Sequence, residues 1–207
     1  MNIERRTTSQ KIAKTSVRKK EKRAEGDEPR TIGGYGAVFY NASDPGTEIE
    51  LWDNTFERIM PGAFDKTLAD AQADVLSLFN HNDNFVLGRR SAETLQLSVD
   101  ATGLIYEVDE NVLDPQWTSV AAKVQRGDVT GASFMFRVRE QVWRDEDDRS
   151  TREILDVELI EVGPVTFPWY PSASAGMRAE NVDELKRSRQ AAIAELAQRS
   201  AAARRRI

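Results

Sequence analysis

The sequence predicts an α+β protein whose main element is a mostly antiparallel sheet or barrel, flanked by a few helices. Three observations support this fold class. Short segments that alternate apolar and polar residues recur along the chain, turn-forming residues separate them, and helical segments are few and do not alternate regularly with the strands. With 207 residues and 40% hydrophobic content, the chain can bury a core of ordinary size.

Order is expected to begin at about residue 31. Residues 1–30 are rich in charge and lack apolar periodicity, so we expect a disordered basic arm. Residues 31–40 are a strand-like run opened by glycines, and a cluster of turn-forming residues follows at 41–46. The next expected elements are two short extended segments and a short helix that buries Phe64, Leu68 and Ala71, at residues 48–52, 56–59 and 63–68.

The central part of the chain predicts a strand, a hairpin and a helix. An apolar segment of strand length, residues 74–81, ends at a histidine, and residues 95–108 alternate on either side of a central turn. Asp114 can cap a helix, Pro115 suits the first helical turn, and Gly127 can end the helix. This is the clearest helix of the sequence.

Two long strands are expected to follow the helix. The first, at residues 130–143, places four apolar side chains on one face, those of Ala132, Phe134, Phe136 and Val138. A charged turn at 145–149 leads to a partner strand at 152–162. Three prolines are expected to end regular structure after it, at positions 164, 168 and 171.

The C-terminal residues predict one more helix. Asn181 and Glu184 can form a capping box before an alanine-rich stretch, but the apolar stripe of residues 180–206 is thin. Such a helix needs a partner to be stable. The expected organisation is therefore a disordered basic arm at residues 1–30, one folded domain of ordinary size at 31–175 and a helical basic tail at 176–207.

Charge and composition exclude several classes of protein. Both ends are basic, whereas the middle of the chain holds 11 Lys and Arg against 25 Asp and Glu. This acidic body argues against a broad nucleic-acid surface, although the basic ends could contact nucleic acid or an acidic partner. The absence of cysteine excludes disulfides and thiol catalysis and suits a reducing cytoplasm. The sequence contains neither a membrane-spanning apolar stretch nor the apolar segment of a secretion signal.

Two residues could form a catalytic pair. His81 is the one histidine of the chain and lies in a polar segment at the end of a strand. Ser133 lies within a strand, and the alternation turns its side chain away from the apolar face, together with Met135 and Arg137. A serine in a strand is usually a small polar residue and a lone histidine is usually structural, and no Gly-x-Ser-x-Gly elbow marks a nucleophile.

The strand at 152–162 adds two carboxylates. Glu161 continues the apolar row of Leu155, Val157 and Leu159, whereas Glu158 lies on the other face. A carboxylate in an apolar row should be partly buried and should seek a partner, which could be His81 or an arginine. Metal ligation is not indicated, because one histidine with scattered carboxylates has no recognised ligand spacing. The residues alone thus predict a soluble, β-rich domain with a possible Ser/His site.

Several segments, taken together and in order, resemble the phage prohead protease family, the serine proteases of capsid maturation. The match covers about residues 31–175 and includes a Pro-Gly-Ala-Phe signature at 61–64. The other segments that carry it are residues 34–39, 79–81, 86–89, 102–106, 127–137 and 157–168. The resemblance implies a fold of the herpesvirus-assemblin type, a mostly antiparallel β-barrel wrapped by helices.

The resemblance also implies roles for residues. His81 would be the general base, Ser133 the nucleophile and Glu161, in preference to Glu158, the third catalytic residue. Backbone N–H groups near residues 133–135, with Arg137, are candidate oxyanion donors. Two positions depart from the family pattern: Met135 stands where many relatives have glycine, and Gly163-Pro164 stands where relatives often have serine and an aliphatic residue. No cofactor or metal is expected.

The function that the resemblance implies is proteolysis during prohead maturation. The substrates would be the scaffold or the scaffolding segment of the capsid protein, and the protease's own tails, inside an immature capsid in the host cytoplasm, where the protease would self-associate. The alternative is a non-enzymatic assembly factor that docks on capsid proteins through the C-terminal helix. A nucleic-acid-binding module that uses the basic ends is a third hypothesis.

Overall fold

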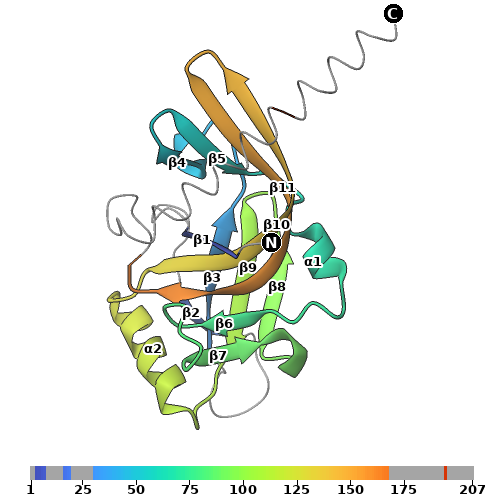
Figure 1. Cartoon of the computed structure of the whole chain (residues 1–207). Coiled ribbons are helices and arrows are strands. Elements are labelled where there is room, and N and C mark those ends of the chain that lie inside the picture. Colours follow the sequence, from blue (N-terminus) through green and yellow to red (C-terminus); the bar gives the residue numbers. More distant parts are fainter. Residues whose placement is uncertain (1–2, 8–15, 20–29, 168–193, 195–207) are drawn as a thin grey trace, which may run out of the picture.

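The computed structural model describes residues 3–7, 16–19, 30–167 and 194. Its strands form two sheets, and its helices are few and short (Figure 1). The predicted α+β class with a dominant, mostly antiparallel sheet is therefore confirmed. The predicted closure into a barrel is not, because the strand pairing of the described residues leaves two separate open sheets.

The larger sheet is built around one long hairpin. Its strands β10 (Gly131–Glu146) and β11 (Arg149–Val165) pair along nearly their whole length, and three register irregularities interrupt the pairing. Bulges of this kind bend strands, and Figure 1 shows the hairpin curving from the body of the molecule to a projecting tip. The remaining strands of this sheet are β1 (Glu4–Thr7), β4 (Glu48–Trp52), β5 (Thr55–Ile59), β6 (Leu76–Leu78) and β7 (Val86–Arg89).

The smaller sheet has the order β2-β3-β9-β8, and all its strands are antiparallel. Strands β8 (Leu95–Val99) and β9 (Gly103–Asp109) form the predicted hairpin, whose turn is closed by Asp100 accepting hydrogen bonds from the backbone N–H groups of Thr102 and Gly103. Strand β3 (Arg30–Val38) pairs with β9, and β2 (Ser16–Lys19) completes the edge.

Helix α2 (Pro115–Arg126) begins and ends where the sequence indicates, whereas the helix expected at residues 63–68 spans Asp65–Ala69. In α2, the Asp114 side chain accepts a hydrogen bond of 2.9 Å from the Gln116 N–H, and Gly127 ends the helix with φ of 87°. The apolar side of α2 is buried. The other helices are α1 (Asp65–Ala69), η1 (Pro45–Thr47) and η2 (Arg90–Ala92). Within α1 and its flanks Phe64 and Thr67 are buried, whereas Ala71, predicted to be buried, is exposed. No described helix is long and apolar enough to cross a membrane.

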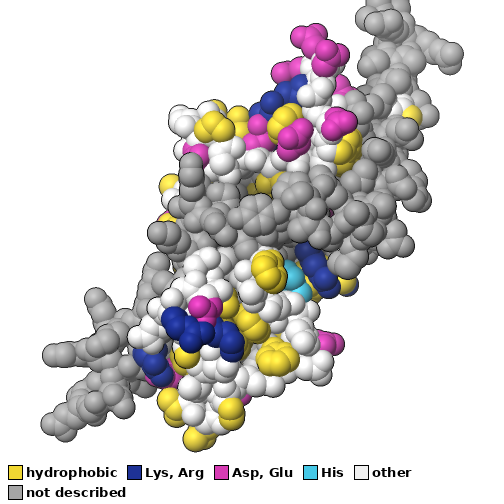
Figure 2. Space-filling view, turned by 90° about the vertical axis from the view of Figure 1, so that its left-hand side faces the viewer, with side chains coloured by type: hydrophobic (Ala, Val, Ile, Leu, Met, Phe, Trp, Pro, Cys, Tyr) yellow, Lys and Arg dark blue, Asp and Glu magenta, His cyan; other side chains and the backbone are white. Residues whose placement is uncertain are grey.

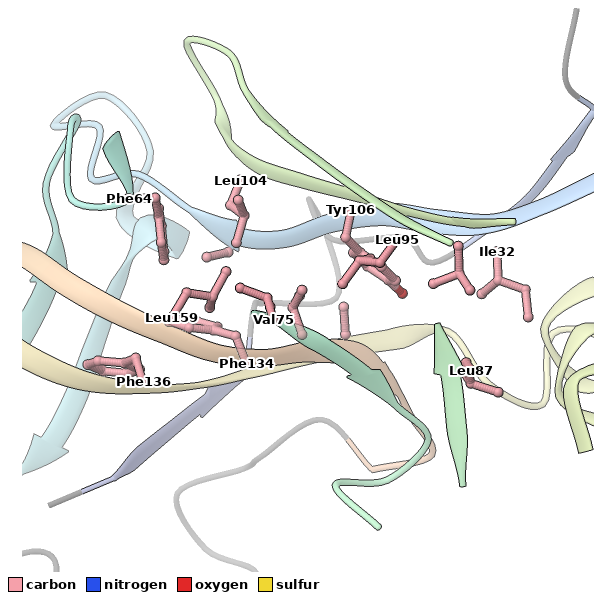
Figure 3. Packing of buried hydrophobic residues seen from close by; sticks show 14 of the residues in the cluster. Ile32, Phe64, Val75, Leu87, Leu95, Leu104, Tyr106, Phe134, Phe136 and Leu159 are labelled. Carbon is pink, nitrogen blue, oxygen red and sulfur yellow. The ribbon is translucent and has the colours of Figure 1, made fainter. Parts of the chain in front are cut away.

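The core lies between the two sheets. Figure 3 shows apolar side chains of β3, β8 and β9 facing those of β10 and β11, with Phe64 and Val75 between them. The alternating residues Ala132, Phe134 and Phe136 of β10 are buried here, as their spacing predicts. Because this face of the hairpin is fixed in the core, the side chains on its other face are held in one position, which is where the candidate site lies.

The N-terminal segment and the end of β11 differ from the expectations. The predicted disordered arm at 1–30 is corrected at two places, since residues 4–7 and 16–19 pair as β1 and β2. Regular structure does not end at Pro164, because β11 continues through it to Val165. The predicted helical tail at 176–207 lies outside the described residues apart from residue 194, which is helical.

Candidate active site

His81 lies in a turn that follows β6, and its backbone has an uncommon conformation. Asn80 and His81 both have φ of 56°, in the left-handed region that few non-glycine residues adopt. The turn is tied to the end of β11, because the Asn80 N–H donates to the Pro164 carbonyl (3.0 Å) and the Asn80 side chain exchanges hydrogen bonds with Thr166 (2.7 and 3.1 Å). These contacts hold the histidine ring against β10 and β11.

The structure brings His81 and Ser133 together. The imidazole Nε2 lies 2.7 Å from the Ser133 Oγ, although 52 residues separate the two in the chain. Ser133 is buried, with 1% of its surface exposed, whereas the His81 side chain is 16% exposed. Figure 2 shows part of the histidine at the molecular surface. The geometry allows a proton to pass from the serine hydroxyl to the ring.

Glu161 lies on the other side of the ring. Its Oε2 is 2.5 Å from the His81 Nδ1, so one nitrogen of the imidazole faces a carboxylate and the other faces a hydroxyl. Ser133, His81 and Glu161 thus form one hydrogen-bonded line. Glu158 does not contact the histidine and is instead ion-paired with Arg137 at 2.8 Å.

Glu161 reaches this position through a bulge, not through the apolar row that predicted it. Leu159 pairs with Phe136 and the next pair is Glu161 with Met135, so Ile160 is an extra residue on β11. The extra residue reverses the alternation. Glu161 consequently shares the face of Ser133 and Met135 rather than the core face of Leu159. The sequence argument selected the residue that contacts His81 but assigned it to the wrong face.

Burial makes ionisation of the Glu161 carboxyl unfavourable. Only 1% of its side chain is exposed, and this desolvation raises the pKa of the carboxyl above its ordinary value, while the hydrogen bond and charge of His81 act in the opposite direction. The ionised carboxylate therefore depends mainly on the imidazole beside it. Such a carboxylate gains most when the ring becomes positively charged.

Gly163 allows the two parts of the site to approach. It pairs with Ser133 across the hairpin, and a Cβ placed on it would lie 2.2 Å from the backbone oxygen of Leu78. β11 therefore meets β6 at a distance that only glycine permits.

A strand from the N-terminal segment lies beside the serine. β1 is the edge strand next to β10, with Thr7 opposite Ser133 and Glu4 opposite Phe136. The Ser133 hydroxyl donates a hydrogen bond of 2.9 Å to the carbonyl oxygen of Arg6. This contact was missed by sequence reasoning, because a four-residue strand in a charged segment has no periodicity to detect.

Other predicted participants take different positions. Met135 accepts a contact from the Arg5 Nε at 3.1 Å, and Arg137 is held by Glu158. The assignment of Arg137 and of the N–H groups near 133–135 as oxyanion donors stays a prediction. Within the described ranges, no group of three or more histidine, aspartate or glutamate residues could hold a metal ion.

A carboxylate, an imidazole and a serine hydroxyl in one line form the arrangement by which serine hydrolases move a proton. Here the same three groups lie in the same order on a mixed α+β fold. The family model described as caudovirus prohead serine protease matches residues 14–188. The chain therefore belongs to the caudovirus prohead serine protease family, and the resemblance predicted from the ordered motifs is confirmed.

The chain is similar to the bacteriophage T4 capsid assembly protease, gp21, with a TM-score of 0.47 and 12% sequence identity over 81% of this chain and 98% of the other. No curated protein matches the chain at a significant level.

Proposed function

We propose that the protein is an endopeptidase in which Ser133 is the nucleophile, His81 the general base and Glu161 the residue that orients the imidazole. The observation that carries the proposal is the continuous line of contacts, 2.7 Å from Ser133 to His81 and 2.5 Å from His81 to Glu161. With the Nδ1 proton donated to Glu161, Nε2 is able to accept the serine proton. Nothing in this mechanism requires a cofactor.

The reaction is acyl transfer followed by hydrolysis. The Ser133 oxygen attacks the substrate carbonyl while His81 takes its proton, and the protonated ring then donates that proton to the departing amine. A water molecule, deprotonated by the same ring, releases the acyl group. Glu161 stabilises the imidazolium in both steps, and its burial strengthens that interaction, since the two charges meet in a region of low dielectric constant.

The substrates that we propose are the scaffold or the scaffolding segment of the capsid protein, inside the assembling capsid in the host cell. Membership of a prohead protease family supports this choice. We also propose that the chain cleaves itself. The contact between Ser133 and the Arg6 carbonyl supports this second proposal, because a peptide bond of the same chain already lies at the nucleophile.

Co-expression with the capsid and scaffolding proteins of the same phage tests the function. We expect Ser133→Ala and His81→Ala to leave these proteins uncleaved, while Ser98→Ala, which changes an exposed serine of β8, leaves processing normal. Circular dichroism and gel filtration of each variant check that the fold is kept. Normal processing by both site variants would exclude the enzymatic function and favour a passive assembly role.

A further inference from the structure

The strand β1 lies beside the nucleophile as an extended substrate would. It runs antiparallel to β10 through four consecutive residue pairs that end with Thr7 opposite Ser133. Addition of an extended segment to a sheet edge is a common mode of peptide recognition. The carbonyl that contacts the Ser133 hydroxyl at 2.9 Å belongs to the peptide bond between Arg6 and Thr7. The residue before this bond is therefore Arg6.

The side chain of Arg6 enters a closed site. Only 1% of it is exposed, and it meets Glu57 of β5, whose side chain is 0% exposed. The Arg6 Nε contacts one carboxylate oxygen of Glu57 and Nη2 donates to the other at 3.0 Å. The guanidinium also lies 5.7 Å from the centre of the Phe136 ring. A planar, two-pronged contact of this kind suits arginine and not lysine.

A second charge of β1 is recognised two residues earlier. The Glu4 carboxylate accepts hydrogen bonds from both terminal nitrogens of Arg152, at 2.7 and 2.9 Å. Arg152 also donates to Glu57 at 2.8 Å and to the Gln141 side chain at 2.6 Å. Arg5, between the two recognised residues, is exposed, and its Nε contacts the Met135 sulfur at 3.1 Å.

The charges explain why both residues are needed. Glu57 and Arg152 belong to the body of the protein, and they form an ion pair of 2.8 Å in which their opposite charges compensate each other. An occupant that brought only a cation or only an anion would add an uncompensated charge to this buried site, which is strongly unfavourable. An occupant with arginine and glutamate two positions apart adds none. Such residues lie on the same side of an extended strand.

We propose that Glu57 and Arg152 form the specificity site of the protease, and that its substrates carry Glu-x-Arg immediately before the cleaved bond. This inference rests on the proposed function. The sequence contains Glu-x-Arg at three places, which end at Arg6, Arg23 and Arg30, and all three fall in the first thirty residues. Arg30 opens β3 and is ion-paired with Glu110, so it is protected within the fold. Self-cleavage is thus expected after Arg6 and after Arg23.

Cleavage of the bond between Arg6 and Thr7 follows the proposed mechanism. The hydroxyl proton of Ser133 turns from the Arg6 oxygen to Nε2 of His81 as a bond forms between Oγ and the Arg6 carbonyl carbon. The bond between that carbon and the Thr7 nitrogen then breaks, and the nitrogen takes the proton from His81. Water then hydrolyses the acyl group, which releases residues 1–6 with a new carboxylate.

Mass spectrometry of the full chain over time tests the site within one molecule. The wild type is expected to yield products that begin at Thr7 and Ala24, and Ser133→Ala neither. Arg6→Gln should slow only the product that begins at Thr7, by about 10- to 100-fold, the range expected for a lost charged hydrogen bond. Arg126→Gln removes the same charge from an exposed residue at the end of α2, outside the site, and should change neither rate.

A peptide mixture made by digesting a proteome with an unrelated protease separates this inference from the proposed function. Bonds that the wild-type chain cleaves and Ser133→Ala does not should follow Glu-x-Arg. Glu57→Gln should reduce their cleavage while the melting temperature reports that the fold is kept. Serine-dependent cleavage of the peptides after residues other than arginine would overturn the specificity site but not the protease function. The same holds if Arg6→Gln leaves the rate of formation of the product that begins at Thr7 unchanged. Absence of any serine-dependent cleavage would overturn both.

Discussion

Replacing Glu161 by glutamine is the most informative single change at the site. Glutamine keeps the size of the side chain and removes only the charge, at a position where Oε2 lies 2.5 Å from the imidazole Nδ1 and 1% of the side chain is exposed. The ring gains a positive charge when it accepts the Ser133 proton. The carboxylate therefore stabilises the transition state more than the resting enzyme, which is the requirement for an effect on kcat.

The size of the effect follows from the contact distance and the burial. Two unit charges whose centres are about 4 Å apart interact with about 4 kcal/mol at an effective dielectric constant of about 20. Loss of this interaction corresponds to about a 10³-fold decrease in kcat. Glutamine can also donate to Nδ1, which places the ring proton on Nε2 and prevents it from accepting the serine proton. We therefore expect a decrease of about 10³- to 10⁴-fold.

The stability of the same variant should change in the opposite direction. Burial raises the pKa of Glu161 in the folded protein, so ionisation of this carboxyl costs folding free energy as pH rises through that pKa. Glu161→Gln removes this cost. We expect the variant to be more stable than the wild type at pH 7 and not at pH 4, where the wild-type carboxyl is protonated in the fold.

Initial rates of peptide cleavage and urea denaturation measure the two effects. Glu158→Gln, on the same strand and ion-paired with Arg137, is the matched control, and its kcat should stay within about threefold of the wild type because exposed ion pairs contribute little. A decrease of less than about tenfold for Glu161→Gln, with the fold intact, would refute the role of the carboxylate in orienting His81.

Three further predictions concern the parts that position the site. Gly163→Ala places a methyl group 2.2 Å from the Leu78 oxygen and must displace the His81 turn. We expect kcat to fall at least about 100-fold and the free energy of unfolding to fall by about 1–3 kcal/mol. Unchanged kinetics would show that the contact is unimportant. Asn80→Ala removes two hydrogen bonds and puts alanine at φ of 56°, which should cost about 2 kcal/mol by chemical denaturation, whereas Asn80→Gly, which tolerates that backbone, should cost less. Burial alone would raise the pKa of Glu4, but the two guanidinium groups beside it lower this pKa below 4.5. The docking of β1 is therefore complete above pH 4.5 and weakens as pH falls through the lowered pKa. Hydrogen exchange of the β1 amides should quicken on acidification beyond the intrinsic change, and constant protection would contradict this prediction.

The parts of the fold that depend on neighbouring residues could be predicted from the sequence. The cap at Asp114, the stop at Gly127 and the alternation along β10 are local signals, and each produced the expected element. The burial of Phe134 and Phe136 follows from the same alternation. Ser133 was therefore placed correctly on the face opposite the core.

The features that depend on distant contacts could not be predicted in this way. The bulge at Ile160 arises from the pairing of two long strands, and it moves Glu161 to the face of the serine. The left-handed backbone at His81 is maintained by bonds to the end of β11, which lies more than 80 residues away. β1 is defined by ion pairs with Glu57 and Arg152, and a short charged segment does not reveal such partners by its own pattern.

Covalent labelling tests the central claim most directly, because it reports which atom is the nucleophile. The full-length protein is treated with a fluorophosphonate, and the modified residue is located by peptide mapping while substrate cleavage is followed in parallel. The account predicts one phosphonyl group on Ser133, in proportion to lost activity, and none in His81→Ala. An active preparation that is fully inhibited by the reagent with Ser133 unmodified would contradict it.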